Sequence, residues 1–170
     1  RFTTIDPGQD MDVARFDPAW PTTALTIKLA AQPIADGFAG TFVARNEEAG
    51  TLDAGRVPLT ALSARYAWDG KSISLDDIDA ALTGGGTATG RGTLPLDGRP
   101  SQWDVRIADV DLSSVQSSLL STRLSGTLAA EVAEQRQVVR ADLRQADMAL
   151  SFAANVEGRR VAVERFRAQT

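Results

Sequence analysis

Apolar and polar residues alternate with a period of two along most of this 170-residue chain. This period places successive side chains on opposite faces of a β-strand, so it predicts a sheet with one apolar and one polar face. The clearest runs are residues 25–29, 62–68, 103–107 and 124–132. The sequence therefore predicts an all-β fold, a curved and elongated antiparallel sheet.

Part of this pattern occurs twice. Residues 40–82 match residues 126–170, with an offset of 86 between Gly40 and Gly126 and an offset of 88 in the later pairs, such as Leu62 with Leu150. A repeat that keeps its phase is typical of stacked, open-ended architectures whose units share one core. We therefore expect the sheet to be built from degenerate repeats related by a translation along one axis.

Local signals mark the ends and irregularities of the strands. Residues 69–71 and 157–159 predict hairpin turns around a glycine, and residues 97–100 predict a looser turn. The alternation slips by one residue at 76–77 and again at 164–165, which predicts a β-bulge in each copy. Both copies thus share a bulge as well as a strand pattern.

The chain divides into two parts. Residues 1–23 contain three prolines and predict an irregular lead-in with one strand near residues 11–16, while residues 24–170 form the sheet domain. Leu112, Val115 and Leu119 indicate a short turn or helix that caps the sheet. Because the chain begins with arginine and its last copy stops early, we expect a segment of a longer protein, with any signal peptide or anchor outside it.

Composition excludes several function classes. The net charge of −4 and the scattered basic residues argue against binding of nucleic acid. The chain has no cysteine and no histidine, so thiolate metal sites and histidine-dependent triads are excluded, and a serine–aspartate pair has no activating base. We expect neither an enzyme nor a cofactor.

A glycine-rich segment covers residues 83–92. A dinucleotide fingerprint would need glycine at Thr89, and a phosphate loop would need lysine at Arg91. The segment therefore predicts a tight turn that leads into a strand with small inward residues, which leave space on that face. These inward positions are Ala88, Gly90, Gly92 and Leu94.

Acidic residues cluster in the same region. Metal binding or glycoside chemistry would need such carboxylates. In the second copy, however, arginine stands at positions 165 and 167, and a metal site does not tolerate this change of sign. The pattern favours a solvated strand face or a bulge over a metal site. The cluster consists of Asp76, Asp77 and Asp79, with Asp109 and Asp111 further along.

Three segments, residues 82–94, 103–112 and 124–128, carry a family resemblance through their order and spacing. They combine a run of glycines and small residues, a tryptophan strand, and a Leu-x-Gly-x-Leu start of the next unit. Together they resemble the TamB branch of the AsmA-like, bridge-like lipid transfer proteins. The resemblance implies a periplasmic β-taco, an inner-membrane anchor, and an outer-membrane barrel partner reached through regions outside this segment.

The resemblance also implies a function, which is to carry phospholipids between membranes and to support outer-membrane biogenesis. Exposure of an acyl chain of about sixteen carbons to water costs about 13 kcal/mol, and an apolar trough removes that barrier. The predicted partners are phospholipid acyl chains. The candidate groove residues are Leu25, Ile27, Leu29, Leu62, Tyr66, Trp68, Ile73, Leu75, Leu94, Trp103, Val105, Ile107, Leu124, Leu128, Leu150, Phe152 and Val156.

Two other functions fit the same residues. The sheet can serve as a scaffold that assists outer-membrane protein assembly, by lending strand edges to clients or by self-association through those edges. It can also form a carbohydrate-binding β-sandwich whose aromatic side chains contact sugars. The alternation alone leaves these readings open, because an open sheet and a closed sandwich need the same pattern.

Overall fold

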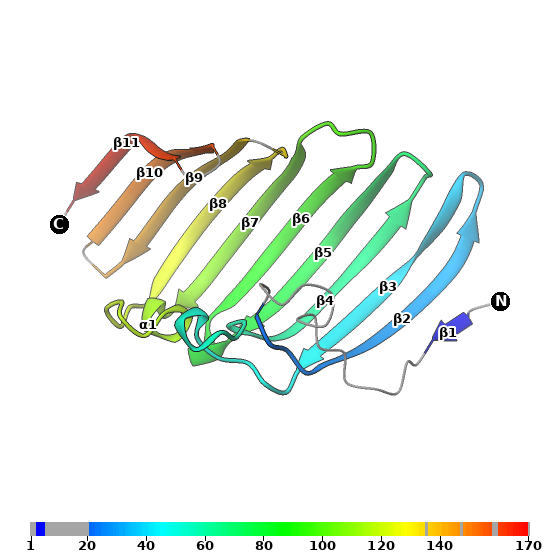
Figure 1. Ribbon diagram of the computed structural model, residues 1–170, viewed down its shortest axis with the longest axis horizontal. Helices are drawn as coiled ribbons and strands as arrows, with labels where there is room; N and C mark the ends of the chain where they lie inside the picture. The colour runs from blue at the N-terminus through cyan, green and yellow to red at the C-terminus, as the bar shows by residue number, and fades with distance from the viewer. Residues whose placement is uncertain (1–2, 6–20, 135, 147, 158–159, 170) are drawn as a thin grey trace.

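The computed structural model describes residues 3–5, 21–134, 136–146, 148–157 and 160–169, which form one 11-stranded sheet. The strands lie side by side in chain order, and each pair of neighbours is antiparallel (Figure 1). The strands bow along their length, so the sheet is curved as well as elongated. The prediction of an all-β antiparallel sheet is confirmed.

Ten of the eleven strands are nine to eleven residues long, and the described residues also form three short helical segments. The strands are β1 (Thr3–Ile5), β2 (Leu25–Ile34), β3 (Gly37–Asn46), β4 (Leu59–Trp68), β5 (Ser72–Leu82), β6 (Thr87–Pro95), β7 (Ser101–Val110), β8 (Leu124–Val132), β9 (Arg136–Gln145), β10 (Met148–Glu157) and β11 (Arg160–Gln169). The helical segments are η2 (Leu52–Ala54), η3 (Thr83–Gly85) and α1 (Leu112–Val115).

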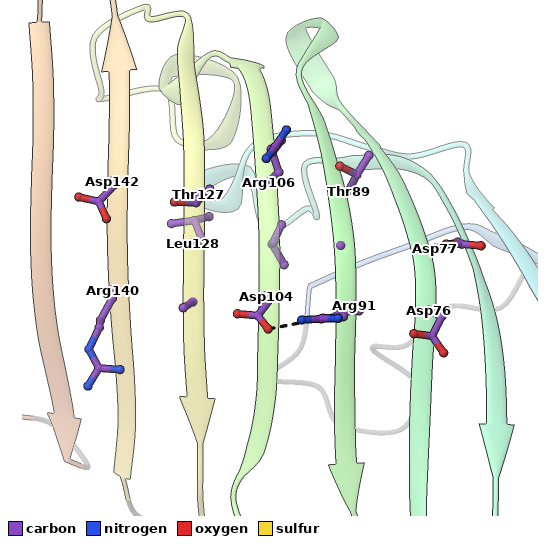
Figure 2. A pocket seen from close by; sticks show the side chains of 13 residues that line it. Asp76, Asp77, Thr89, Arg91, Asp104, Arg106, Thr127, Leu128, Arg140 and Asp142 are labelled. Atoms are coloured by element: carbon purple, nitrogen blue, oxygen red, sulfur yellow. Dashed lines mark ion pairs between the residues drawn. The ribbon is translucent and has the colours of Figure 1, made fainter.

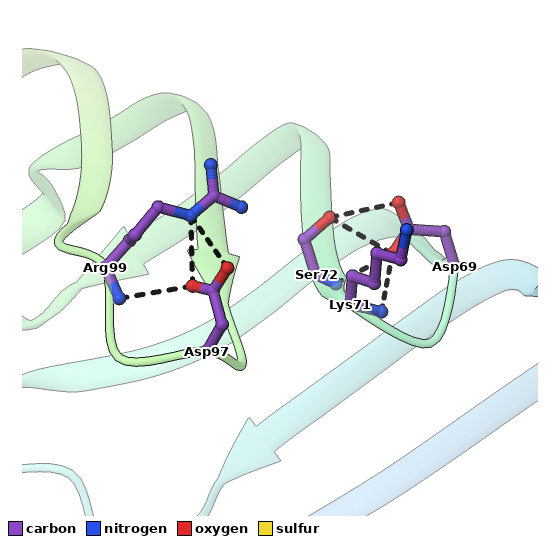
Figure 3. A network of polar contacts seen from close by, with 5 residues as sticks. All are labelled: Asp69, Lys71, Ser72, Asp97 and Arg99. Atoms are coloured by element: carbon purple, nitrogen blue, oxygen red, sulfur yellow. Dashed lines mark hydrogen bonds and ion pairs between the residues drawn. The ribbon is translucent and has the colours of Figure 1, made fainter.

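The predicted turns form where aspartate and glycine stand together. Asp69 Oδ1 accepts hydrogen bonds from the backbone N–H groups of Lys71 (2.9 Å) and Ser72 (2.7 Å), while Gly70 takes a φ of 81° (Figure 3). The turn between β6 and β7 is built in the same way. Asp97 accepts hydrogen bonds from the backbone N–H and from Nε of Arg99, and Gly98 takes a φ of 83°. These two turns are confirmed, and the third predicted turn includes residues 158–159, which lie outside the described residues.

Both predicted bulges are present. The β5 register against β6 shifts between Leu75 and Ile78, where Asp77 has a φ of 48°. The β11 register against β10 shifts between Ala153 and Ala154. A further shift interrupts β7 and β8 around Asp109, which also takes a positive φ of 54°. Aspartate tolerates this conformation better than most residues, so Asp77 and Asp109 mark the bulges, whereas Asp79 holds a paired strand position opposite Thr89.

The predicted repeat is not confirmed as a structural unit, although the pairing register of one hairpin recurs. The pairs Leu62 with Ala80 in β4–β5 and Leu150 with Ala168 in β10–β11 have the same register at the offset of 88. These two hairpins lie six strands apart, whereas β3 and β8 lie five strands apart and therefore run in opposite directions. Because β9 has no counterpart between β3 and β4, a single translation cannot relate both copies.

The lead-in prediction needs a correction at its start. Thr3–Ile5 forms β1, which pairs with residues 29–31 of β2, so part of residues 1–23 belongs to the sheet. A three-residue strand carries too short an alternating pattern to be recognised by periodicity. The strand expected near residues 11–16 lies outside the described residues.

The helical segments gather at one end of the strands, and the hairpin tips of Figure 3 lie at the other end (Figure 1). Leu112 and Val115 of α1 pack against buried residues of β7–β9, so α1 caps one end of the sheet as its apolar spacing predicted. The predicted third residue, Leu119, follows the helix and is 44% exposed. The buried cluster beneath the cap consists of Ile107, Val110, Leu124, Ala141 and Leu143.

Candidate functional site

The strand register brings the candidate groove residues onto one face of the sheet. Leu29 lies beside Phe42 and Gly40 lies beside Tyr66, and the same parity continues strand by strand to Leu128 opposite Val105 and Leu150 opposite Leu143. All the candidate groove residues from Leu25 to Phe152 lie on this same face. Val156 also holds a strand position on it, and its side chain lies outside the described ones. We call this side of β2–β11 the apolar face and the other side the polar face.

The apolar face is free of charged residues along its paired positions. Between β2 and β11, no Asp, Glu, Lys or Arg holds a described pairing position on this face. Its few polar members are neutral, such as Asn46 and Ser101, which are both buried. A face this large without charge is unusual for a surface in contact with water.

Burial changes along the strands of this face. Beneath α1, Leu124 is 3% exposed and Leu143 is 7% exposed. Toward the hairpin tips, Phe38 is 47% exposed, Leu94 is 42% exposed, and the rings of Phe38 and Trp68 stack with centroids 5.9 Å apart. All described strands belong to one sheet, so no second sheet of described residues covers these side chains. A two-layer sandwich is therefore not the architecture of the described chain.

Large aromatic rings fill the positions that small residues leave empty. A Cβ on Gly92 would lie 2.3 Å from the Trp103 ring, which therefore occupies the space expected to remain open there. The indole nitrogen of Trp103 donates to Ser101 Oγ at 2.9 Å, which holds the ring in place. Tyr66 stands opposite Gly40, and its hydroxyl donates to the backbone oxygen of Ala30 at 3.2 Å, one strand further on. The expectation that the small residues leave space on this face is thus wrong at Gly92.

The sequence pattern missed several members of the apolar face. Phe42 and Val139 occupy this face through their pairs with Leu29 and Ala130, and Val110 pairs with Leu124 beyond a bulge. Alternation gives a weak signal in β9, where Gln137 and Ala141 share the face with Val139. The bulge at residues 108–109 shifts the parity before Val110, so counting by two from Trp103 places it on the wrong face.

The polar face carries a shallow hollow of about 700 Å³ over β5–β9 (Figure 2). Arginine and aspartate alternate across it, with Arg91 Nε 3.7 Å from Asp104 Oδ2. Asp77 at the bulge forms an ion pair with Arg65 of β4. Among the described residues, no group of three or more acidic side chains is placed to hold a metal ion. Charges of both signs make this hollow unsuited to an acyl chain.

A hydrogen-bonded contact ties the cap segments together. Asp53 of η2 accepts hydrogen bonds from the Ser117 hydroxyl and from the Ser117 backbone N–H, the latter at 3.0 Å. Thr83 and Ser114 also exchange side-chain hydrogen bonds with each other's backbone oxygens, at 3.0 and 2.6 Å. These bonds join three loops that are far apart in the chain and hold α1 over the buried end of the apolar face.

The Asp53 contact predicts a loss of stability in acid. Hydrogen bonds from Ser117 lower the pKa of Asp53 from 3.8 to about 2. Because the folded pKa lies below the unfolded one, the contribution is complete above about pH 4 and is lost as the pH falls toward 2. We expect Asp53→Asn to flatten the pH dependence of the urea midpoint in this window.

The control for this prediction removes the donor instead of the acceptor. Ser117→Ala should flatten the same part of the curve less than Asp53→Asn, because it removes the hydroxyl donor but leaves the backbone N–H of residue 117 bonded to Asp53. Hydrogen bonds also lower the pKa values of Asp69, Asp97 and Asp111, so part of the acid sensitivity should remain in either variant. Curves for both variants that run parallel to the wild-type curve between pH 2 and 5 would contradict the assignment.

Comparison with protein-family models, with curated proteins and with solved structures gave no match in any of the three. Within the described residues, none of the helices has the length and apolar character needed to cross a lipid bilayer.

Proposed function

We propose that the apolar face carries phospholipid acyl chains, as one stretch of a conduit between the inner and outer membranes of a Gram-negative periplasm. The observation that carries this proposal is the continuous face of β2–β11, which has no charged residue at a described pairing position and is exposed toward the hairpin tips. An acyl chain that leaves water gains about 0.8 kcal/mol per CH₂ group. Contact with such a face supplies this gain without a ligand-specific residue.

The strand edge supports a second candidate, a scaffold for the assembly of other β-rich proteins. β11 is ten residues long and pairs with β10 on one side, and the described residues provide no strand on its other side. An uncovered edge of this length offers backbone donors and acceptors to an added strand. The first candidate uses the face of the sheet and the second uses its edge, so variants can separate them.

Site-specific photocrosslinking tests the first candidate. Leu94 on the apolar face and Val43 on the polar face are each 42% exposed, so they form a matched pair. We expect p-benzoyl-phenylalanine at position 94 to label phospholipid from vesicles of phosphatidylethanolamine and phosphatidylglycerol at least tenfold more than the same residue at position 43. The measurement is the mass of the labelled protein.

Equal labelling at the two positions in a folded protein would overturn the proposal, because a conduit requires one face to be preferred. In the full-length protein, Leu94→Asp should reduce phospholipid labelling and weaken the outer-membrane barrier, while Val43→Asp should leave both unchanged. Loss of outer-membrane protein assembly with normal lipid labelling would favour the scaffold.

A further inference from the structure

We propose that two copies of this chain pack apolar face against apolar face, as a dimer with two-fold symmetry. The sheet is a single layer, and a sheet with one apolar face reaches a stable fold when a second layer covers that face. The described chain provides only α1 and its neighbouring loops as cover, at one end of the strands. A second copy supplies a complementary layer of the same width and the same uncharged character.

The solvent-accessible surface of the chain is larger than that of a compact monomer of the same mass. The chain has a solvent-accessible surface of 11517 Å², whereas a compact monomer of 18.1 kDa exposes about 8,100 Å². The excess is roughly 3,400 Å² and is summed over both faces and the edges of the single-layer sheet, so the apolar face holds only part of it. A stable protein interface takes about 800 Å² from each partner, so a contact over part of the apolar face is sufficient.

The composition of the face favours a second copy over a charged partner. No described pairing position on it holds an ionisable acid or base, so a face-to-face contact buries no unpaired charge. Phe38, Trp68 and Leu94 provide exposed apolar side chains near the tips. Large apolar side chains of this kind form the centres of interfaces between identical subunits.

The cap determines the orientation of the dimer. Packed sheets lie about 10 Å apart, and α1 occupies the apolar side of β7 and β8 at one end. Two caps at the same end would collide, so the two-fold axis runs across the strands and places the cap of one copy over the exposed tips of the other. The stack of Phe38 and Trp68 would then face the opposite ends of β3 and β4 in the partner, because this axis places each strand against its own copy.

This inference uses the same face as the proposed lipid function but does not depend on it. Acyl chains and a second copy compete for the face, so lipid or detergent should dissociate the dimer. A monomer that crosslinks lipid at position 94 would overturn the dimer alone, and a dimer that never exchanges for lipid would overturn the conduit alone.

Sedimentation equilibrium over a concentration series tests the dimer. We expect the wild-type chain to have twice the mass of one chain, Leu94→Asp to raise the dissociation constant at least 100-fold, and Val43→Asp to leave it unchanged. Far-UV circular dichroism shows whether each variant is folded. As a second measurement, dodecyl maltoside should convert the wild-type dimer to a monomer without change in the circular dichroism spectrum.

Two results would overturn the proposal. One is a wild-type chain that stays monomeric at high concentration without lipid or detergent. The other is a dimer that Leu94→Asp does not weaken and that detergent does not dissociate, because such a dimer does not form through the apolar face.

Discussion

Replacement of Gly126 by alanine is expected to destabilise the protein by about 3 kcal/mol or more. A Cβ at this position would lie 2.0 Å from the backbone oxygen of Asp142 and 2.9 Å from the Cα of Leu143. Neither atom can move without shifting β9, and the residues that pair with Gly126, Ile107 and Leu143, are both buried in the core. Urea unfolding of the wild type and the variant measures the loss.

Gly50→Ala is the matched control. Its Cβ would lie 2.8 Å from Cδ of Arg56, which is a flexible side-chain atom, and the change should stay within about 0.5 kcal/mol. If the Gly126 and Gly50 variants lose similar stability, the close approach of β8 and β9 is not the cause. A changed slope of the unfolding curve in the Gly126 variant would indicate that the sheet no longer folds as one unit.

The second large effect is expected from Leu124→Ala, at about 3 kcal/mol. Leu124 is 3% exposed and lies in the buried cluster beneath α1, so the substitution leaves a cavity that the surrounding β-sheet cannot close. Leu120→Ala removes the same atoms from a side chain that is 84% exposed, and it should have almost no effect. Thermal or urea unfolding of the two variants gives the comparison.

Equal losses for the two leucines would mean that the capped end is no better packed than the loop beside it. A large loss at Leu124 alone would show that the cap end is the stable part of the sheet. That result fits both proposals, in which lipid or a second copy covers the exposed hairpin half of the apolar face.

The local chemistry of the chain predicts the elements of the fold. Alternation with a period of two places the long regular strands and their faces, although not β1 or β9, and aspartate followed by glycine places the tips at Gly70 and Gly98. The slips at residues 76–77 and 164–165 place two bulges correctly. These features depend on neighbours in the sequence, so the sequence is enough to predict them.

The arrangement of the apolar face depends on strands far apart in the chain. Within each regular run, the sequence by itself determined which side chains share a face, because alternation is a property of that run alone. It did not do so for Val110, which lies beyond the bulge at residues 108–109. Only the tertiary structure decided that no second sheet of described residues covers that face, that Trp103 fills the space over Gly92, and that β9 breaks the repeat. An open sheet and a closed sandwich bury the same alternating residues, and they differ only in what packs on top.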